Sequence, residues 1–242
     1  MSSPNPPLLR ADSVCHHSLP GSGSEQLRGV SLGIEARRFT LLTGAPGCGA
    51  GLLLRILGLL DRPDTGEVWF ESRSTGSLDD ADRLALRNHA FGFLFAEPFL
   101  LDSFSVAENV AMPLFKICGL DIEHARIRTA EVLDFAGLAE AADLPVADLS
   151  ILDHHKVSLA RAIATSPQVL IAQDAGLQLA PRDLREFTML LRTVPDALGV
   201  AVIATSPESP DTLSPDREIR LEQGSVVVDS NPVTGQEAPA HD

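Results

Sequence analysis

Short apolar runs alternate with helical patterns along most of the chain. Three β-type runs, FTLLTG (residues 39–44), QVLIAQD (168–174) and GVAVIATS (199–206), end in residues typical of turns. The segments LLLRILGLL and DLREFTMLLRTV, which follow the first two runs, space their apolar residues as helices do. The alternation predicts a doubly wound α/β core with a mostly parallel sheet.

Two segments depart from this alternation. EIRLEQGSVVVD (218–229) is predicted to form two short strands around Gln223-Gly224. Residues 105–143 show only helical patterns, with Pro113 and Gly119 predicted as breaks. We therefore expect an antiparallel β portion and a helical subdomain, over about residues 97–160, inserted in the α/β core.

The two ends of the chain have little apolar content. Residues 1–7 and 230–242 are rich in polar residues and proline and are predicted to be flexible tails, which leaves residues 8–229 as the domain. The N-terminus lacks a basic region followed by an apolar stretch, and the most apolar run, residues 51–60, is short and contains Arg55. We expect neither a standard secretion signal nor a membrane span.

Charge and cysteine content narrow the classes of function. The chain has 33 Asp and Glu against 19 Lys and Arg, a formal net charge of −14. Such a surface repels phosphate backbones, so no nucleic-acid partner is expected. Cys15, Cys48 and Cys118 lack CxxC or histidine spacing, which argues against a zinc site or a disulfide framework and suits a reducing cytosol.

A glycine-rich turn follows the first β-type run. In GAPGCGAG, two glycines match the phosphate-binding pattern GxxxxGK[ST], and an apolar helix follows. However, Ala50 stands in place of the lysine and Gly51 in place of the hydroxyl residue that ligates Mg²⁺. Two interpretations stay open: a nucleotide site, or a tight turn retained for folding. The candidate nucleotide-binding residues are Gly44, Ala45, Pro46, Gly47, Cys48, Gly49, Ala50 and Gly51.

Longer stretches of the chain resemble one known family. They are LRGVSLGIEARRFTLLTGAPGCGAGLLLRILGLLDRPDTGEVWF, FGFLFAEPFLLDSFSVAENVAMPL, LSILDHHKVSLARAIATSPQVLIAQDAGLQLA, VAVIATSP and REIRLEQGSVV. Together they are similar to the ATP-binding subunit (nucleotide-binding domain) of ABC, or ATP-binding cassette, transporters of the lipoprotein-release and macrolide-export type. The resemblance covers about residues 8–229 and implies a P-loop NTPase-like core (an ABC ATPase fold).

The resemblance also locates the family's catalytic positions, and this chain departs from the pattern at them. Ala96 falls on the Q-loop glutamine, Ala180 on the D-loop aspartate and Ser206 on the switch histidine. Gln173 and Asp174 fall on the metal-binding Asp and the catalytic Glu of the Walker B motif. Gln173 supplies no negative charge to Mg²⁺. Asp174 either polarises a water or is a carboxylate without chemistry at a strand end, and Ser206 is equally explained as a turn cap. No protein metal ligands are therefore expected, because Gly51 and Gln173 occupy the Mg²⁺ positions.

The family's signature LSGGQ is replaced by LSILD. In the family, backbone N–H groups at this helix start close on the γ-phosphate bound to the opposite subunit, which requires the glycines. Here two bulky residues and a like charge stand at that contact. The signature residues are Leu149, Ser150, Ile151, Leu152 and Asp153.

Three histidines could be taken for functional groups. The adenine-stacking aromatic of the family falls near His17 or Ser18, and we expect His17 to be an exposed loop residue. His154 and His155 are adjacent on a predicted helix, where neighbouring positions do not face each other. We expect both to lie on an exposed face and to bind no metal.

The segment FLLDSFSVAENVAMPLF corresponds to the family's contact with the membrane subunit. Taken one by one, its apolar side chains are expected in the core, although the segment as a whole is suited to docking. These residues are Phe99, Leu100, Leu101, Phe104 and Phe115.

These observations favour a pseudo-ATPase: a noncatalytic ABC-type subunit of a membrane transporter complex, with ATP and Mg²⁺ bound weakly or not at all. A slow but genuine ABC ATPase that energises export or lipoprotein release is the alternative, and a soluble regulatory or interaction protein is the second. The expected partners are a transmembrane permease and a second nucleotide-binding chain, in a homodimer or heterodimer. The expected location is cytoplasmic, peripheral on the inner face of the cell membrane.

Overall fold

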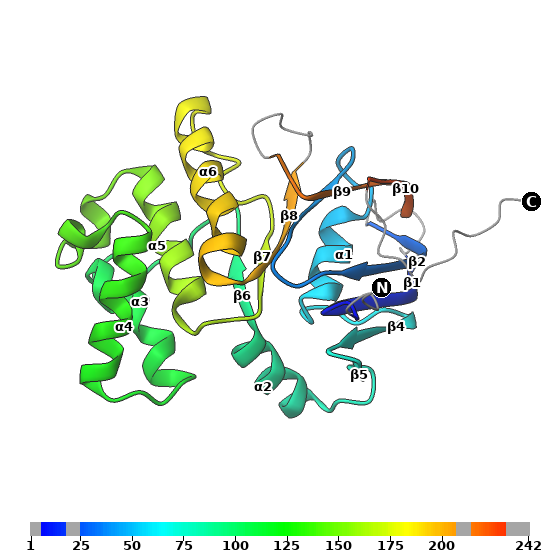
Figure 1. The fold of residues 1–242 in the computed structure, drawn as a ribbon. Coiled ribbons are helices and arrows are strands. Elements are labelled where there is room, and N and C mark those ends of the chain that lie inside the picture. Colours follow the sequence, from blue (N-terminus) through cyan, green and yellow to red (C-terminus); the bar gives the residue numbers. More distant parts are fainter. Residues whose placement is uncertain (1–5, 18–24, 207–213, 231–242) are drawn as a thin grey trace, which may run out of the picture.

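A six-stranded sheet forms the centre of the protein (Figure 1). The computed structural model describes residues 6–17, 25–206 and 214–230. The strand order is β10-β9-β3-β8-β7-β6, in which only β10 is antiparallel to its neighbour. The strands are β3 (Phe39–Thr43), β6 (Phe91–Leu94), β7 (Val169–Ala172), β8 (Ala201–Ser206), β9 (Arg217–Glu222) and β10 (Ser225–Asp229). The predicted parallel core and the terminal pair of strands are confirmed.

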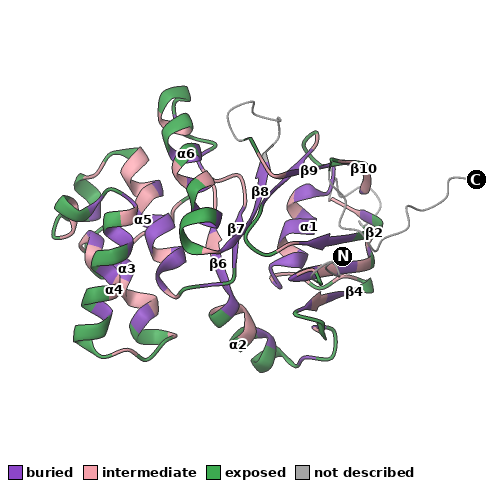
Figure 2. Ribbon diagram, in the orientation of Figure 1, coloured by how far each residue is buried: buried purple, intermediate pink, exposed green. Residues whose placement is uncertain are grey.

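A second, antiparallel sheet stands beside the first, in the order β2-β1-β4-β5. Its strands are β1 (Leu9–His16), β2 (Leu27–Ile34), β4 (Thr65–Phe70) and β5 (Arg73–Ser74). Helix α1 (Ala50–Leu57) lies between the two sheets, and six of its eight residues are buried in the core that the sheets share (Figure 2). The P-loop-like turn, which precedes α1, is therefore fixed at both ends by buried structure.

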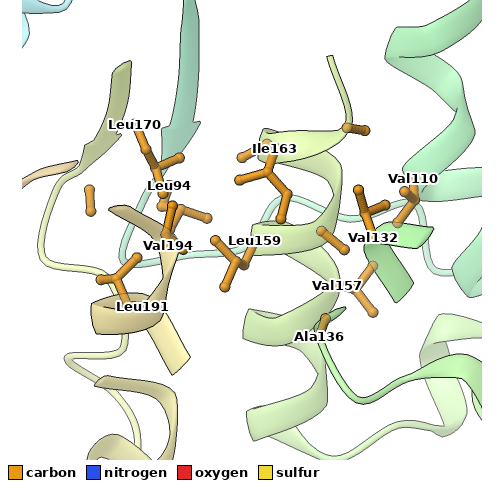
Figure 3. Packing of buried hydrophobic residues seen from close by; sticks show 14 of the residues in the cluster. Leu94, Val110, Val132, Ala136, Val157, Leu159, Ile163, Leu170, Leu191 and Val194 are labelled. Carbon is orange, nitrogen blue, oxygen red and sulfur yellow. The ribbon is translucent and has the colours of Figure 1, made fainter. Parts of the chain in front are cut away.

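The remaining helices cover the other side of the six-stranded sheet or lie beyond its β6 edge (Figure 1). They are α2 (Asp80–Ala90), α3 (Val106–Lys116), α4 (Ile122–Phe135), α5 (Ile151–Ala164) and α6 (Pro181–Leu198), with the 3-10 turns η1 (Ala139–Ala141) and η2 (Val146–Asp148). Helices α3 and α4 pack on α5, and α5 and α6 pack toward the sheet in one continuous core (Figure 3).

Pro113 lies inside α3, so the prediction of a helix break at this residue is wrong. The helix is fixed at its start by a reciprocal capping box between Ser105 and Glu108. Val106, Val110 and Leu114 repeat every four residues on its buried face. This packing outweighs the loss of one backbone hydrogen bond at the proline.

Candidate functional site

The P-loop-like turn joins the end of β3 to the start of α1, as predicted. Gly44 and Gly49 have φ values of 149° and 100°, in the region that favours glycine. A Cβ atom on Gly49 would lie 2.6 Å from the backbone oxygen of Gln26, and one on Gly44 would lie 2.6 Å from Sγ of Cys48. These glycines are therefore needed to build the turn itself, whether or not the turn binds a phosphate.

The groups beside Gly51 do not suit a magnesium–nucleotide complex. A Cβ atom on Gly51 would lie 3.4 Å from Oε2 of Glu25 and 3.5 Å from Nε2 of Gln173. The Gln173 amide turns its N–H, a donor, toward this position, and its oxygen, the atom that could ligate a cation, lies farther away. The neighbouring Ala50 is buried and carries no charge that could pair with phosphate. With a carboxylate on the phosphate side of the turn and no lysine at position 50, the residues present do not fit Mg²⁺-ATP.

Asp174 follows β7 at the edge where β8 also ends. The Thr205 hydroxyl donates to Oδ1 of Asp174 at 2.9 Å, and the Asp174 backbone N–H donates to the same hydroxyl oxygen at 2.9 Å. Ser206 is the last residue of β8 and its backbone pairs with Thr43. Asp174 has a φ of 51°. The carboxylate is therefore part of a local hydrogen-bonded link between two strand ends.

The other degenerate positions lie around this edge. Ala96 is half-buried after the end of β6. Ala180 is exposed and precedes the first residue of α6. The methyl groups at these two positions provide neither a metal ligand nor a hydrogen bond to a water.

The signature residues form the start of α5, at a distance along the chain from the turn. Ser150 is the N-cap residue, and its hydroxyl donates to Oδ2 of Asp153 at 2.7 Å. The Ile151 side chain is 61% exposed, whereas Leu149 and Leu152 pack partly into the core. The surface at the start of α5 therefore carries an apolar side chain and a carboxylate.

The histidines differ in part from expectation. His17 is exposed and its backbone N–H donates to Asp64, while Ser18 lies outside the described residues. His155 is only 2% exposed and packs on Phe187 at 5.5 Å between ring centroids, so the prediction of an exposed face is wrong. Helix α5 is covered by α3, α4 and α6, and a helix packed on several sides buries adjacent positions. Nε2 of His154 lies 2.8 Å from the Val146 oxygen.

The docking segment is more exposed than predicted. Phe99 is 62% exposed, and the core interpretation is also wrong for Leu101, Phe104 and Phe115, which are exposed. Leu100 packs partly against the core. Phe99, Leu101 and Phe104 follow β6 in a loop that runs across the surface before α3 begins. Phe115 lies near the end of α3, outside the buried face of that helix.

Phe99 lines a groove of about 410 Å³ between the end of β6, α3 and α5. A row of aromatic rings, Phe91, Phe93, Phe95 and Phe99, leads along it with neighbouring centroids 6.1 to 6.3 Å apart. The groove is apolar with a basic rim, and its basic lining residues are Arg87, Lys116 and Arg161.

Arg161 shapes this groove, although the sequence analysis did not single it out. Its guanidinium donates to the backbone oxygens of Pro98 and Phe99 at 2.7 and 2.9 Å. Burial lowers the pKa of the Arg161 guanidinium from its usual value. Glu25 and Thr205 were also missed, because each acts on a residue that is distant in sequence. The sequence feature that could have identified Arg161 is its basic side chain on the otherwise apolar face of α5.

Within residues 6–17, 25–206 and 214–230, no cluster of three or more His, Cys, Asp or Glu side chains is arranged to bind a metal ion. None of the helices in that part of the chain combines the length and apolar content needed to cross a bilayer.

Comparison with known proteins agrees with this fold. The profile of the family described as "ABC transporter" matches residues 27–175. The chain is 37% identical over 208 residues to the lipoprotein-releasing system ATP-binding protein LolD of Myxococcus xanthus, covering 86% of this chain and 92% of the relative. It is 36% identical to the protein of that name from Paramagnetospirillum magneticum, covering 84% and 89%.

Solved structures give the same result. A dimeric ATP-binding cassette in a post-hydrolysis state bound to ADP and Pi superposes with a TM-score of 0.79 at 26% identity, covering 94% of this chain and all of the other. With its fold, its P-loop-like turn and these relatives taken together, the chain belongs to the ABC transporter family, as a cassette similar to lipoprotein-releasing ATP-binding proteins.

Proposed function

We propose that this chain is a noncatalytic ABC-type subunit, a pseudo-ATPase, of a membrane transporter complex. The observation that carries the proposal is the end of the turn, where Ala50 and Gly51 replace the lysine and the hydroxyl residue of the P-loop pattern and the atoms nearest to the Gly51 Cβ position belong to a carboxylate and an amide. A positioned cation and a metal ion each contribute several kcal/mol to phosphoryl-transfer catalysis, so their loss removes most of the rate. ATP and Mg²⁺ are then bound weakly at most.

In this proposal residues 8–229 form the cassette-like domain, with a helical subdomain over about residues 97–160. The chain pairs with a second copy or with another nucleotide-binding chain. If the pair is head-to-tail, each composite site combines one chain's P-loop with the other chain's signature. Ala50 damages the first site, and the exposed Ile151 side chain obstructs the second. Even a partner chain with all of the family's motifs would then leave both composite sites incomplete.

The groove beside Phe99 supports a permease as the membrane partner. It combines the exposed ring of Phe99 and three further aromatic rings with a rim of three basic side chains, in a chain whose formal net charge is −14. An amphipathic segment with an apolar face and an acidic flank would complement it. In this arrangement the chain is cytoplasmic and peripheral on the inner face of the membrane.

The hydrolysis test uses the purified chain with Mg²⁺-ATP. We expect phosphate release at background, and we expect the same from a mixture with an intact subunit when the rate is corrected for that subunit alone. A turnover within the usual enzyme range of about 1 to 10³ per second would contradict the proposal and support the slow-ATPase alternative. An intact relative measured in parallel shows that the assay detects turnover.

The docking test uses co-purification with a permease of the lipoprotein-release type. Phe99→Ala removes an exposed ring that lines the groove, whereas Met189→Ala removes an exposed apolar side chain of α6 outside it. We expect Phe99→Ala to reduce recovery of the permease and Met189→Ala to leave it unchanged. Recovery that neither variant changes, or no recovery with the unaltered chain, would favour the soluble regulatory alternative.

A further inference from the structure

The carboxylate of Glu25 lies in the space that a side chain at position 51 would enter. Its two oxygens are 3.4 and 3.6 Å from the Cβ position of Gly51. In the P-loop pattern, the side chain at this position carries the hydroxyl that ligates Mg²⁺ beside the phosphates. The chain thus supplies a negative charge of its own on the side of the turn where bound phosphates and their metal would lie.

Backbone contacts fix the segment that carries Glu25. The Arg28 N–H donates to the Gly224 oxygen at 2.9 Å, and the Gly224 N–H donates to the Cys48 oxygen at 2.9 Å. The Gln26 oxygen lies 2.6 Å from the Cβ positions of both Gly49 and Gly224. The residues that follow Glu25 are therefore packed directly on the turn, and the carboxylate is brought to it by the main chain.

Arg55 is the cation that pairs with this carboxylate. Nη1 of Arg55 is 3.8 Å from Oε2 of Glu25, and Nε of Arg55 is 2.7 Å from Oδ2 of Asp61. Two carboxylates thus already neutralise the guanidinium one helical turn after Gly51. A polyphosphate that approached the turn would therefore be repelled by the Glu25 carboxylate, and the positive charge of Arg55 would not be available to pair with it.

We propose that Glu25 is an internal anion that competes with nucleotide phosphates for the P-loop-like turn. The proposal rests on the pseudo-ATPase function and deepens it, because it adds an active block to the loss of catalytic groups. The alternative role for Glu25 is that of a metal ligand, in which its carboxylate replaces the missing hydroxyl of position 51. The Gln173 amide turns Nε2, a donor, toward this position, and the Glu25 carboxylate already lies beside the Arg55 guanidinium, so the observations favour the block.

The test compares nucleotide binding by Glu25→Gln and by the unaltered full chain. Glutamine keeps the shape of the side chain and removes its charge. Titration calorimetry with ATP in EDTA, with Mg²⁺-ATP and with Mg²⁺ alone is run on both proteins and on both in the Ala50→Lys/Gly51→Ser background. We expect ATP to bind about tenfold more tightly after the substitution, the effect of removing one nearby like charge.

Glu140→Gln is the matched control, because it removes an exposed carboxylate from η1, in a different part of the fold. This control should bind ATP as the unaltered chain does. If Glu25→Gln does not fold, Glu25→Ala replaces it in every measurement. Unchanged or weaker ATP binding, or no ATP binding by any Glu25 variant in either background, overturns the proposal.

The metal alternative has its own signature in the same experiment. Binding of Mg²⁺ alone by the unaltered chain that is lost in Glu25→Gln would identify a ligand and overturn the block. The pseudo-ATPase function is judged separately, by phosphate release from the unaltered chain. Tighter ATP binding by Glu25→Gln without turnover in the unaltered chain therefore supports both the Glu25 block and the pseudo-ATPase function. Turnover in the unaltered chain refutes the pseudo-ATPase function, whatever the effect of Glu25→Gln on ATP binding.

Discussion

Ser150 and Asp153 satisfy each other at the start of α5: the hydroxyl donates to the carboxylate at 2.7 Å and accepts from the Asp153 N–H at 3.1 Å. A helix start without such a cap presents free N–H groups, which attract an anion. Here the substituted signature LSILD provides its own anion. Ser150 and Asp153 thus cap the start of α5 with a local hydrogen-bonded pair.

This cap predicts a stability effect. Ser150→Ala should lower the free energy of unfolding by about 1 kcal/mol, because the N-terminal N–H loses its acceptor. Urea denaturation followed by circular dichroism measures the change. Ser103→Ala, at an exposed turn position, should change it by less than about 0.5 kcal/mol. Equal effects of the two substitutions would show that the cap contributes nothing.

His155 predicts a loss of stability in mild acid. Burial, and to a lesser degree the charge of His154, lowers the pKa of His155 below its usual value. The unfolded chain, where the pKa is about 6.5, therefore binds more protons, and stability falls as the pH drops through that value. The free energy of unfolding of the unaltered chain should fall more steeply between pH 7.5 and 5.5 than that of His155→Leu.

The control for His155 is His89→Gln, which removes an exposed histidine from α2. Its slope with pH should match that of the unaltered chain. If His155→Leu retains the full slope, then another group causes the acid sensitivity.

Arg217 predicts a large effect of breaking a buried ion pair. Its side chain is 5% exposed, donates twice to Asp229 at 2.7 and 2.5 Å, and also contacts the Gly33 oxygen. Asp229→Ala should cost about 3 kcal/mol, because the guanidinium stays buried without its carboxylate. The double variant Arg217→Met/Asp229→Ala should recover part of that loss.

The exposed pair Arg10–Asp12, 3.0 Å apart, is the control for this ion pair. Asp12→Ala should change the free energy of unfolding by less than about 1 kcal/mol. A double variant at Arg217 and Asp229 that is less stable than Asp229→Ala would contradict the argument from burial.

The hydrogen bonds of Asn109 are expected to stabilise the loop of residues 99–105, which contains Phe99 of the groove. This fully buried amide accepts from the Leu101 N–H at 2.8 Å and donates to the oxygens of Leu101 and Ser105 at 3.1 and 3.0 Å. Asn109→Ala leaves the Leu101 N–H without its acceptor, removes one donor from each of the two oxygens and should cost about 2 to 3 kcal/mol. Limited proteolysis should then cut residues 99–105 faster.

Gln178→Ala, at an exposed position after β7, is the control for Asn109 and should leave both stability and cleavage unchanged. An unchanged cleavage rate in Asn109→Ala would mean that the loop is fixed by Arg161 rather than by the amide.

The local pattern of apolar and turn residues was sufficient to predict the parallel strands of the core. FTLLT, VLIA and the run before Ser206 are continuous apolar segments of strand length, and a glycine turn or a helical pattern follows the first two. These signals lie within about fifteen residues of one another, so they can be read without knowledge of the tertiary structure. The P-loop-like turn was located in the same way.

Contacts between residues distant in sequence determine the features that the local patterns did not predict. Val68 of β4 pairs with Ala11 of β1 across more than fifty residues, and the antiparallel sheet was not predicted from pattern. His155 is buried because three helices surround α5. Glu25 belongs to a polar segment with no motif, and only the path of the chain brings it beside Gly51.

The position of Glu25 also bears on what a single substitution at position 51 can do. A serine there would carry its hydroxyl from a Cβ atom 3.4 Å from the Glu25 carboxylate, within reach of a hydrogen bond to it. The carboxylate would then hold the new hydroxyl beside a negative charge. On the proposed pseudo-ATPase function, Gly51→Ser alone is therefore expected to leave the chain inactive until position 25 also changes.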